Sequence, residues 1–382
     1  MSAPEERADV DAVVVGGGPA GLAAAAELGR AGAVTVVLDA GATAGSSWAA
    51  HYDSLRLNTV AWTSHLPGAR FGRDVGPYPT RDQVVEYLAG YADRHRLDVR
   101  RSTRVERLER VDGAWAVQAG PVRFRAATVV VATGSCGRPK LPDWPGQEEF
   151  AGRVIHSSRY RNADEFTGRR VLVVGGGNSG GEIAADLAAG GAAEVRLSVR
   201  SAPQVVPRRV LGVPTVLVAI GTRRLPAAVG DAAVAVLRRV VLGDVERHGL
   251  TASAEPLSVR YARGGVVPLS HPGFFAHLRR GEIDVVPAVE RLSAAGAHLA
   301  DGRVLEVDVV VAATGFETGL ADLLGTLDVL DARARPRGRG GVPIPGAPGL
   351  FAIGFTDPLS GNLREIRLEA RRIGRAWRST TR

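Results

Sequence analysis

Near its N-terminus the chain reads Val13-Val14-Val15-Gly16-Gly17-Gly18-Pro19-Ala20-Gly21-Leu22, an apolar run followed by spaced glycines. The apolar run predicts a buried parallel strand, and Leu22–Leu28 predicts the helix after it. In such a unit Gly16 turns the chain, Gly18 lets the backbone approach a pyrophosphate, and Gly21 lets the helix pack against the strand. The helix N-terminus then faces the phosphate charge. The stretch therefore predicts a dinucleotide site rather than an ordinary glycine-rich turn.

An acidic residue follows at the position where such a site needs one. The apolar strand Val34–Leu38 ends at Asp39, which lies 23 residues after Gly16. That spacing is close to the one expected for a carboxylate that accepts hydrogen bonds from ribose hydroxyls. The predicted contacts of this first nucleotide are Gly16, Gly18, Pro19, Ala20, Gly21 and Asp39.

A second fingerprint has its first glycine 159 residues after that of the first and reads Val171-Leu172-Val173-Val174-Gly175-Gly176-Gly177-Asn178-Ser179-Gly180. It opens the predicted helix Glu182–Leu187, and the strand Glu194–Val199 ends at Arg200 instead of an acid. An acid there would repel a 2′-phosphate, whereas an arginine pairs with it through two hydrogen bonds. We therefore expect FAD at the first fingerprint and NADPH, not NADH, at the second, although a solvated arginine is an alternative for Arg200. The predicted NADPH contacts are Gly175, Gly177, Asn178, Ser179, Gly180 and Arg200.

Two nucleotide sites in one chain predict an enzyme that moves a hydride from a nicotinamide to a flavin. The expected fold class is α/β, with two Rossmann-like dinucleotide-binding domains and the NADPH domain inserted into the FAD domain. We expect the FAD-binding domain to comprise residues 1–152 and 309–382, and the NADPH-binding domain residues 153–308.

Composition argues against several other classes of protein. The chain has 382 residues and a net charge of +8, but Lys140 is its only lysine and the arginines are scattered, which argues against a nucleic-acid partner. Arginine in place of lysine indicates a GC-rich, bacterial coding sequence. The lone Cys136 excludes both an internal disulfide and the cysteine pair of flavin disulfide reductases. The acidic N-terminus and the short aliphatic runs predict a cytoplasmic protein with no membrane span, and a homodimer stays open.

The rest of the chain predicts a mixture of irregular and regular segments. A long irregular stretch, residues 45–79, is typical of functional loops. It precedes a helix over Arg81–Arg94 with Thr80 as its N-cap. We further expect strands at 103–131, a linker at 139–145, a helical region at 210–243, strands at 304–314, a loose loop at 332–349, a strand at Leu350–Ile353 and a C-terminal helix.

A sequence signature lies between the two fingerprints. It reads Phe150-Ala151-Gly152-Arg153-Val154-Ile155-His156-Ser157-Ser158-Arg159-Tyr160 and resembles the FxGxxxHxxx(Y/F) motif of class B flavin-containing monooxygenases. By this resemblance Asn58 is the asparagine beside the reactive flavin, where its amide orients oxygen; an ordinary loop asparagine is the alternative. Gly45-Ser46-Ser47-Trp48 is similar to a family motif, with a serine replacing the usual second glycine. The further cofactor contacts that the resemblance implies are Ser47, Trp48, Leu57, Thr133, Gly134, Ala313, Thr314 and Gly315.

Within this family the chain resembles the YUCCA-like monooxygenases and their bacterial relatives over residues 10–375. The similar segments are Tyr52–Leu57, Tyr78–Arg81, Val199–Ser201 and Leu242–Asp244. Two departures are the segment Val267–Phe274, which bears on the substrate, and Asp39 in place of a commoner glutamate.

The resemblance implies a single-component, NADPH-dependent FAD monooxygenase that acts through a C4a-(hydro)peroxyflavin on a small organic molecule, with molecular oxygen as co-substrate and no metal. N- or S-oxygenation, hydroxylation and oxidative decarboxylation of a 2-oxo acid stay open. The alternatives are Baeyer–Villiger oxygenation, an NADPH oxidase or flavin reductase that releases hydrogen peroxide, and a flavoprotein without catalysis.

Four residues have two interpretations. For His156 and Tyr160 a structural role stands beside direct cofactor contact. His271 is a catalytic candidate, but a histidine satisfied within its loop is favoured. Trp62 could wall the flavin pocket, although packing in the core is the favoured explanation.

Overall fold

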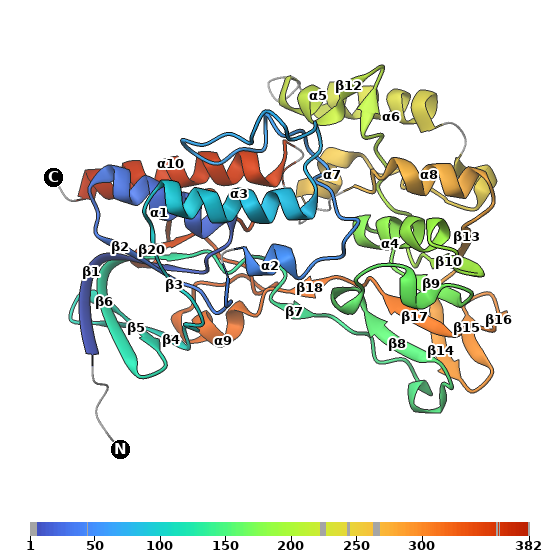
Figure 1. Ribbon diagram of the computed structural model, residues 1–382, viewed down its shortest axis with the longest axis horizontal. Helices are drawn as coiled ribbons and strands as arrows, with labels where there is room; N and C mark the ends of the chain where they lie inside the picture. The colour runs from blue at the N-terminus through green and yellow to red at the C-terminus, as the bar shows by residue number, and fades with distance from the viewer. Residues whose placement is uncertain are drawn as a thin grey trace. The chain divides into compact units, whose positions relative to one another are not determined.

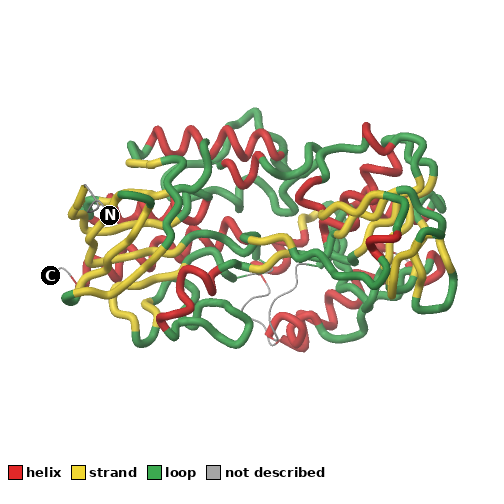
Figure 2. Tube along the Cα trace, turned by 90° about the horizontal axis from the view of Figure 1, so that it is seen from below, coloured by secondary structure: helices red, strands yellow, loops and turns green. Residues whose placement is uncertain are grey.

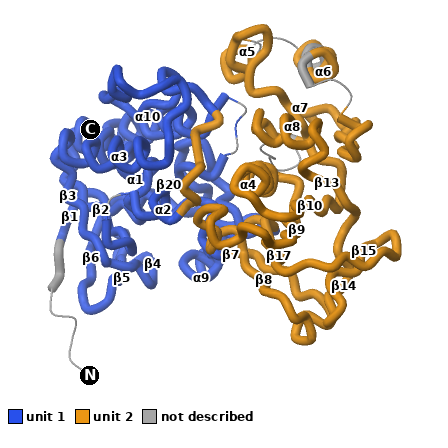
Figure 3. Tube along the Cα trace, turned by 45° about the vertical axis from the view of Figure 1, so that its right-hand side comes forward, with its two compact units in different colours: residues 1–50, 59–138, 316–382 blue, residues 51–58, 139–315 orange. Residues whose placement is uncertain are grey.

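The computed structural model describes residues 6–43, 45–221, 227–242, 245–262, 268–356, 358 and 360–380. Within this part of the chain the fold divides into two compact units (Figure 3). Unit 1 comprises Met1–Ala50, Thr59–Arg138 and Phe316–Arg382, and unit 2 comprises His51–Asn58 and Pro139–Gly315.

Unit 1 is built on a mostly parallel sheet with strand order β19-β20-β6-β1-β2-β3. Its strands are β1 (Glu6–Val15), β2 (Thr35–Leu38), β3 (Asp98–Arg100), β4 (Arg107–Val111), β5 (Ala114–Ala119), β6 (Val122–Val131), β19 (Pro343–Ile344) and β20 (Ala347–Ala352). The central β1 pairs in parallel with β2 and β6, so its apolar side chains are buried between neighbours, as expected for a parallel sheet. β4 and β5 extend the edge of β6 as an antiparallel meander (Figure 2).

Helices cover one face of this sheet. They are α1 (Pro19–Ala31), α3 (Arg81–Arg94) and α10 (Asn362–Thr380), which lie side by side in Figure 1; the shorter α2 (Ser46–Ala49) and α9 (Leu320–Leu324) complete the unit. Thr80 forms the predicted N-cap of α3 as a full capping box with Gln83. α10 packs so closely on α1 that a Cβ at Gly374 would lie 2.8 Å from the carbonyl oxygen of Glu27.

Unit 2 contains a second parallel sheet, in the order β13-β10-β9-β17-β8. Its strands are β8 (Arg153–His156), β9 (Arg170–Val174), β10 (Glu194–Ser198), β13 (Asp284–Val286) and β17 (Val309–Ala312). On one face lie α4 (Asn178–Ala189) and α8 (Pro272–Arg279) over a core that includes Ile183, Leu197 and Phe274. On the other face the antiparallel strands β14 (Val289–Ser293), β15 (Gly296–Leu299) and β16 (Val304–Leu305) pack with Trp144 and Phe150.

The remaining elements of unit 2 follow β10 along the chain. They are β11 (Arg209–Val210), β12 (Val213–Pro214), α5 (Thr215–Gly221), α6 (Ala227–Leu242) and α7 (Leu257–Ala262). They fit the helical region expected at 210–243. Gly243 and Asp244, from a segment that resembles the family, and Val267, from a segment that departs from it, lie outside the described residues.

The α/β class and the insertion of one unit into the other are as predicted, but the boundaries differ. The expectation begins the second FAD-domain segment at residue 309, whereas β17 lies inside the unit 2 sheet because it pairs with β9 and β8. Unit 2 also starts earlier, at Pro139, and includes His51–Asn58. The chain passes between the units at β7 (Arg138–Pro139) and β18 (Phe316–Glu317).

Two local expectations are wrong. Trp62 is 55% exposed, because the turn that buries its neighbours Val60 and Ala61 points the indole outward. The loose loop expected at 332–349 ends in β19 and the start of β20, which pairs in parallel with β6 and so belongs to the sheet. No helix among the described residues is both long and apolar enough to cross a membrane.

Candidate functional site

The first fingerprint forms a tight strand–turn–helix in unit 1. Gly16 has a φ of +108°, and a Cβ there would lie 2.6 Å from the carbonyl oxygen of Ala132. A Cβ at Gly21 would lie 1.8 Å from the carbonyl oxygen of Gly16, so no larger residue fits between helix and strand. A Cβ at Gly18 would meet only Ser47 Oγ, at 3.9 Å. Gly16 and Gly21 thus have the geometry predicted for the turn and for helix packing, and Gly18 faces open space.

The start of α1 has the properties of an anion site. Gly18 is the N-cap residue and supplies no side-chain acceptor, so the first backbone N–H groups of the helix lack a side-chain cap. Pro19 occupies the first turn, where its missing N–H costs nothing. The open space at Gly18 and the uncapped N–H groups fit the pyrophosphate of a dinucleotide.

Three other predicted residues of unit 1 lie around this turn. Asp39 follows β2, and its Oδ2 would be 2.5 Å from a Cβ at Gly17. Its Oδ1 accepts from the backbone N–H of Gly41 at 3.2 Å. Ser47 lies on α2 and faces Gly18, as described above, and Trp48 follows it on the same short helix. The structure therefore brings the predicted ribose carboxylate and the α2 residues to the first fingerprint.

The second fingerprint repeats this geometry in unit 2. Gly175 has a φ of +133°, and a Cβ there would lie 2.3 Å from the carbonyl oxygen of Ala313. A Cβ at Gly180 would lie 1.9 Å from the carbonyl oxygen of Gly175, and one at Gly177 would meet nothing within 4 Å among the described atoms. Gly177 caps α4 without a side-chain acceptor. The second site thus fits a second pyrophosphate.

The chain contains two Ala-Thr-Gly segments, residues 132–134 and 313–315, and each lies beside one fingerprint. Thr133 and Gly134 follow β6 and lie next to Gly16, as the Ala132 contact shows. Ala313, Thr314 and Gly315 follow β17 in unit 2, beside Gly175 rather than in the FAD-binding unit as expected.

Arg200 lies just beyond the end of β10, in the position predicted for 2′-phosphate recognition. Its side chain is exposed. Within the described part of the chain no hydrogen bond or ion pair of its guanidinium is found, whereas Arg196 on the same strand pairs with Glu194 at 2.5 Å. Arg200 is therefore available to a bound anion.

Asn58 is held by a buried carboxylate. Its Nδ2 donates to Oε1 of Glu182 at 3.1 Å, and the hydroxyl of Tyr52 donates to Oε2 of the same residue at 2.6 Å. Arg208 donates to the carbonyl oxygen of Leu57, which fixes the backbone beside Asn58. The segment His51–Asn58 belongs to unit 2 because of these contacts, although its neighbours in sequence belong to unit 1.

The electrostatics of this cluster follow from its burial. Burial raises the pKa of Glu182, while hydrogen bonds from Tyr52 and Asn58 and the charge of Arg208 act in the opposite direction. Burial and the carboxylate of Glu182 raise the pKa of Tyr52 well above its ordinary value, so Tyr52 stays a donor. The Oδ1 atom of Asn58 is buried and has no hydrogen-bond partner within the described residues. An acceptor left in this state costs about 1–3 kcal/mol.

The signature residues His156 and Tyr160 have structural roles in unit 2. The Nδ1 of His156 accepts from the backbone N–H of Ser158 at 3.1 Å, so its Nε2 donates to the carbonyl oxygen of Gly315 at 3.0 Å. Burial lowers the pKa of His156. Tyr160 is fully buried and donates to Asp186 at 2.7 Å. The structural interpretation of both residues is therefore favoured over direct cofactor contact.

The start of α4 also contacts the loop before α8. The Oδ1 of Asn178 accepts from the backbone N–H of Ser270 at 3.1 Å. His271 is the N-cap of α8, where its Nδ1 accepts from the backbone N–H of Phe274 at 3.2 Å. His271 is thus satisfied within its loop, as the sequence favoured.

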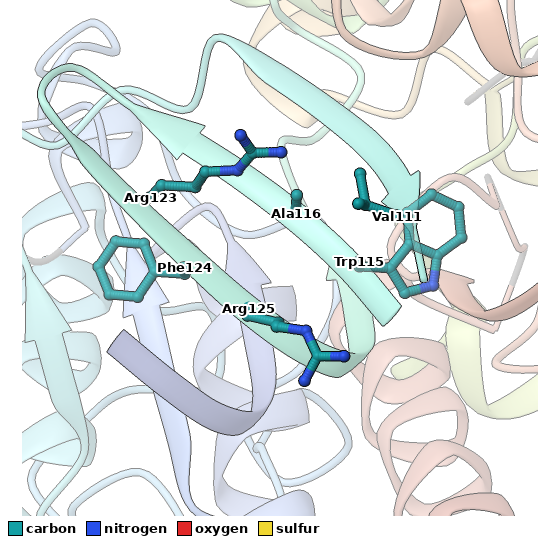
Figure 4. Close-up of a pocket in the computed structure, with 6 residues that line it drawn as sticks. All are labelled: Val111, Trp115, Ala116, Arg123, Phe124 and Arg125. Atoms are coloured by element: carbon teal, nitrogen blue, oxygen red, sulfur yellow. The ribbon is translucent and has the colours of Figure 1, made fainter. Parts of the chain in front are cut away.

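Two hollows lie apart from the glycine cradles in the described part of the chain. The larger, about 530 Å³, lies in unit 2 and is lined by Arg196, Arg247, His248 and Asp284 among others. The smaller hollow on the β4–β6 meander, lined by Trp115, Arg123 and Phe124 among others (Figure 4), measures about 30 Å³. It has room for no more than a water or two. The described residues hold no group of three or more His, Cys, Asp or Glu side chains that could bind a metal ion.

Sequence reasoning missed Tyr52, Glu182 and Arg208 as residues that hold Asn58 and its segment. One signal was present, since Glu182 is an acid among the apolar buried residues of α4, and charged residues are rarely buried unless paired. Its partners, far away in the sequence, carried no such signal.

The whole chain is similar to known flavin enzymes. Residues 13–211 match a family model described as pyridine nucleotide-disulphide oxidoreductase, although a single cysteine cannot form that family's redox pair. Indole-3-pyruvate monooxygenase YUCCA1 of Oryza sativa subsp. japonica is 34% identical over 382 residues, which covers 97% of this chain and 93% of the relative.

Solved structures agree with these sequence matches. A flavin-containing monooxygenase from Stenotrophomonas maltophilia is 28% identical, with a TM-score of 0.73 and coverage of 98% and 100% of the two chains. An open crystal structure of cyclohexanone monooxygenase shares the fold at a TM-score of 0.74 and 21% identity, covering 98% of this chain and 88% of the other. With two nucleotide cradles of matching geometry and relatives aligned over nearly its whole length, this chain belongs to the class B flavin-containing monooxygenases.

Proposed function

We propose that this protein uses FAD and NADPH to oxygenate a 2-oxo acid and to release its carboxyl group as carbon dioxide. Per turnover the 2-oxo acid, one oxygen molecule, one NADPH and one proton would give the shortened carboxylic acid, carbon dioxide, NADP⁺ and water. One oxygen atom enters the new carboxyl group and the other leaves as water.

The duplicated glycine cradle carries the cofactor part of this proposal. Each copy leaves room for a pyrophosphate at its middle glycine, Gly18 or Gly177, at a helix start without a side-chain cap. We assign FAD to unit 1 because Asp39 lies beside its cradle, and NADPH to unit 2 because Arg200 follows β10. The bound cofactors supply the redox and oxygen chemistry, while the chain binds and orients them.

The substrate class rests on the relatives. Two curated relatives aligned over 90% or more of this chain are named indole-3-pyruvate monooxygenase and probable indole-3-pyruvate monooxygenase, and indole-3-pyruvate is a 2-oxo acid. Asn58 is our candidate catalytic residue, with Leu57 beside it. A cytoplasmic location, a bacterial source and a homodimer belong to the same proposal and rest on composition alone.

The decisive experiment incubates the purified enzyme with NADPH, ¹⁸O₂ and indole-3-pyruvate. We expect one labelled oxygen in the carboxyl group of the product and one carbon dioxide per NADPH. Hydrogen peroxide equal to the NADPH consumed would instead identify an oxidase. If 2-oxo acids are not turned over, oxygenated products from sulfides or amines would indicate S- or N-oxygenation. Products from cyclic ketones would indicate Baeyer–Villiger insertion.

A further inference from the structure

The amide of Asn58 has one neighbour that determines which way it points. Its Nδ2 lies 3.1 Å from Oε1 of Glu182, and Glu182 is only 5% exposed. Burial raises the pKa of Glu182, but the hydrogen bonds from Tyr52 and Asn58 favour its ionised form, which has no hydrogen to give, so the Nδ2 end of the amide faces it. As an acceptor at Oε1, Glu182 therefore sets the orientation of Asn58 in unit 2.

Two hydrogen-bond donors face the carboxylate of Glu182. Tyr52 is buried, and the one acceptor of its hydroxyl among the described contacts is Oε2 of Glu182, at 2.6 Å. Glu182 thus accepts at both oxygens, from Tyr52 at Oε2 and from Asn58 at Oε1.

The other end of the Asn58 amide has no partner within the described part of the chain. Its Oδ1 is buried there, and buried acceptors require donors. We propose that Glu182 is a positioning residue that turns the Asn58 amide so that Oδ1 is the acceptor offered to a donor group of the bound reactants. The resemblance implied only that the Asn58 amide orients oxygen; the arrangement of Tyr52, Glu182 and Asn58 assigns it an acceptor role. This inference rests on the proposed catalytic role of Asn58.

The substitution Glu182→Gln tests this inference with little change of volume. Because the hydroxyl of Tyr52 has no other acceptor among the described contacts, we expect it to donate to the new amide oxygen. The new NH₂ group then faces Asn58, which must turn over and offer Oδ1 instead of Nδ2. Adding Tyr52→Phe removes the donor that causes this inversion, so the double variant can return Asn58 to its original orientation.

The fold supplies a matched control on the same helix. Asp186 lies one turn beyond Glu182 on α4 and accepts from the buried hydroxyl of Tyr160 at 2.7 Å, without a hydrogen bond to Asn58 among the described contacts. Asp186→Asn therefore removes a nearby, partly buried acidic charge without changing a hydrogen bond of Asn58. An effect of losing an acidic charge from this helix should appear in this variant too.

The first readout does not depend on activity. In holoenzyme labelled with ¹⁵N-asparagine, the side-chain NH₂ signals of Asn58 are identified by their loss in Asn58→Leu. We expect these signals to move in Glu182→Gln, to return toward the wild-type position when Tyr52→Phe is added, and to stay in place in Asp186→Asn. Unmoved signals in Glu182→Gln, or equal movement in Asp186→Asn, would overturn the inference.

The second readout is the hydrogen peroxide formed per NADPH with indole-3-pyruvate as probe. We expect Glu182→Gln to raise it about fivefold, which corresponds to the difference of about 1 kcal/mol between a charge-assisted and a neutral hydrogen bond, while reduction of the flavin by NADPH is unchanged. Combining Glu182→Gln with Asn58→Leu should add nothing to Asn58→Leu alone. If Asn58→Leu itself has no effect, the proposed role of Asn58 fails; if it has an effect and Glu182→Gln has none, the positioning role of Glu182 fails.

Discussion

Gly180 lies so close to Gly175 that a Cβ on Gly180 would be 1.9 Å from the carbonyl oxygen of Gly175. Gly21 and Gly16 repeat this relationship in unit 1, at 1.8 Å. In each unit the third glycine is needed by the fold, since a side chain would push the helix off the strand. The middle glycine faces open space, so the fold itself does not require it. Mutation can therefore separate the structural position from the one that we assign to binding.

Gly18→Val should give a folded protein without colour. The protein itself leaves room at this position, but the added side chain occupies the space that we assign to the FAD pyrophosphate. The measurements are far-ultraviolet circular dichroism and the ratio of absorbance at about 450 nm to that of the protein after purification. If the variant keeps full flavin occupancy, the assignment of FAD to this cradle is wrong.

Gly21→Ala provides the contrast. Its Cβ meets a backbone oxygen that cannot move without breaking the β1–α1 turn, so we expect loss of the folded protein and not only of FAD. Gly177→Ala should behave like Gly18→Val but in the other unit, with FAD retained and the KM for NADPH raised. Equal behaviour of Gly18→Val and Gly21→Ala would contradict the division of roles.

Arg200→Ala should remove the preference for NADPH over NADH. One charge-assisted contact with the 2′-phosphate supplies about 1.5–3 kcal/mol, or roughly ten- to a hundredfold in kcat/KM. NADH kinetics should hardly change. The control is Arg196→Ala, since Arg196 lies on the same strand but is paired with Glu194. An equal loss with both cofactors would show that Arg200 supports the fold instead.

Sequence patterns predicted the parts of the fold that local physics decides. Spaced glycines have short-range reasons, so both cradles lie where they were expected. The capping box at Thr80 is equally local. Long-range pairing was less accessible, because nothing near Val309 in the sequence indicates that β17 inserts between β8 and β9. That pairing moved the domain boundary and placed Ala313–Gly315 in the other unit.

The environment of Asn58 also depends on contacts between residues far apart in the sequence. The residue was found by resemblance, but its partner Glu182 is 124 positions away and entered the sequence analysis only as the start of a helix. The exposure of Trp62 likewise depends on the local turn that carries it, which residue type does not reveal. Assignments of cofactor contacts to single residues stay predictions.

Asn58→Leu should separate reduction of the flavin from use of oxygen. The substitution keeps approximately the same volume and removes both the acceptor Oδ1 and the donor Nδ2. FAD content and the rate of flavin reduction by NADPH should persist, while more of the NADPH consumed appears as hydrogen peroxide. The measurement compares peroxide with oxygenated product at fixed NADPH. Unchanged coupling would leave Asn58 as a residue that only anchors its segment to Glu182.

His271→Asn should make the stability of the protein less sensitive to acid. Burial, helped by the nearby charges of Arg208 and His277, lowers the pKa of His271 to about 4. The neutral Nδ1 caps α8 by accepting from Phe274, and a protonated ring cannot do so.

The sign of the effect follows from the direction of this pKa shift. The unfolded chain binds a proton near pH 6.5 and the folded chain only near pH 4, so stability is full above pH 6.5 and falls as the pH drops toward 4. Between pH 7 and pH 5 this one group should cost about 2 kcal/mol. Asparagine is a good N-cap and does not titrate, so His271→Asn should keep the cap and lose that part of the pH dependence. Urea denaturation at the two pH values measures the difference, with wild-type protein as reference. An equal loss of stability in both proteins would mean that His271 is not the group that takes up the proton.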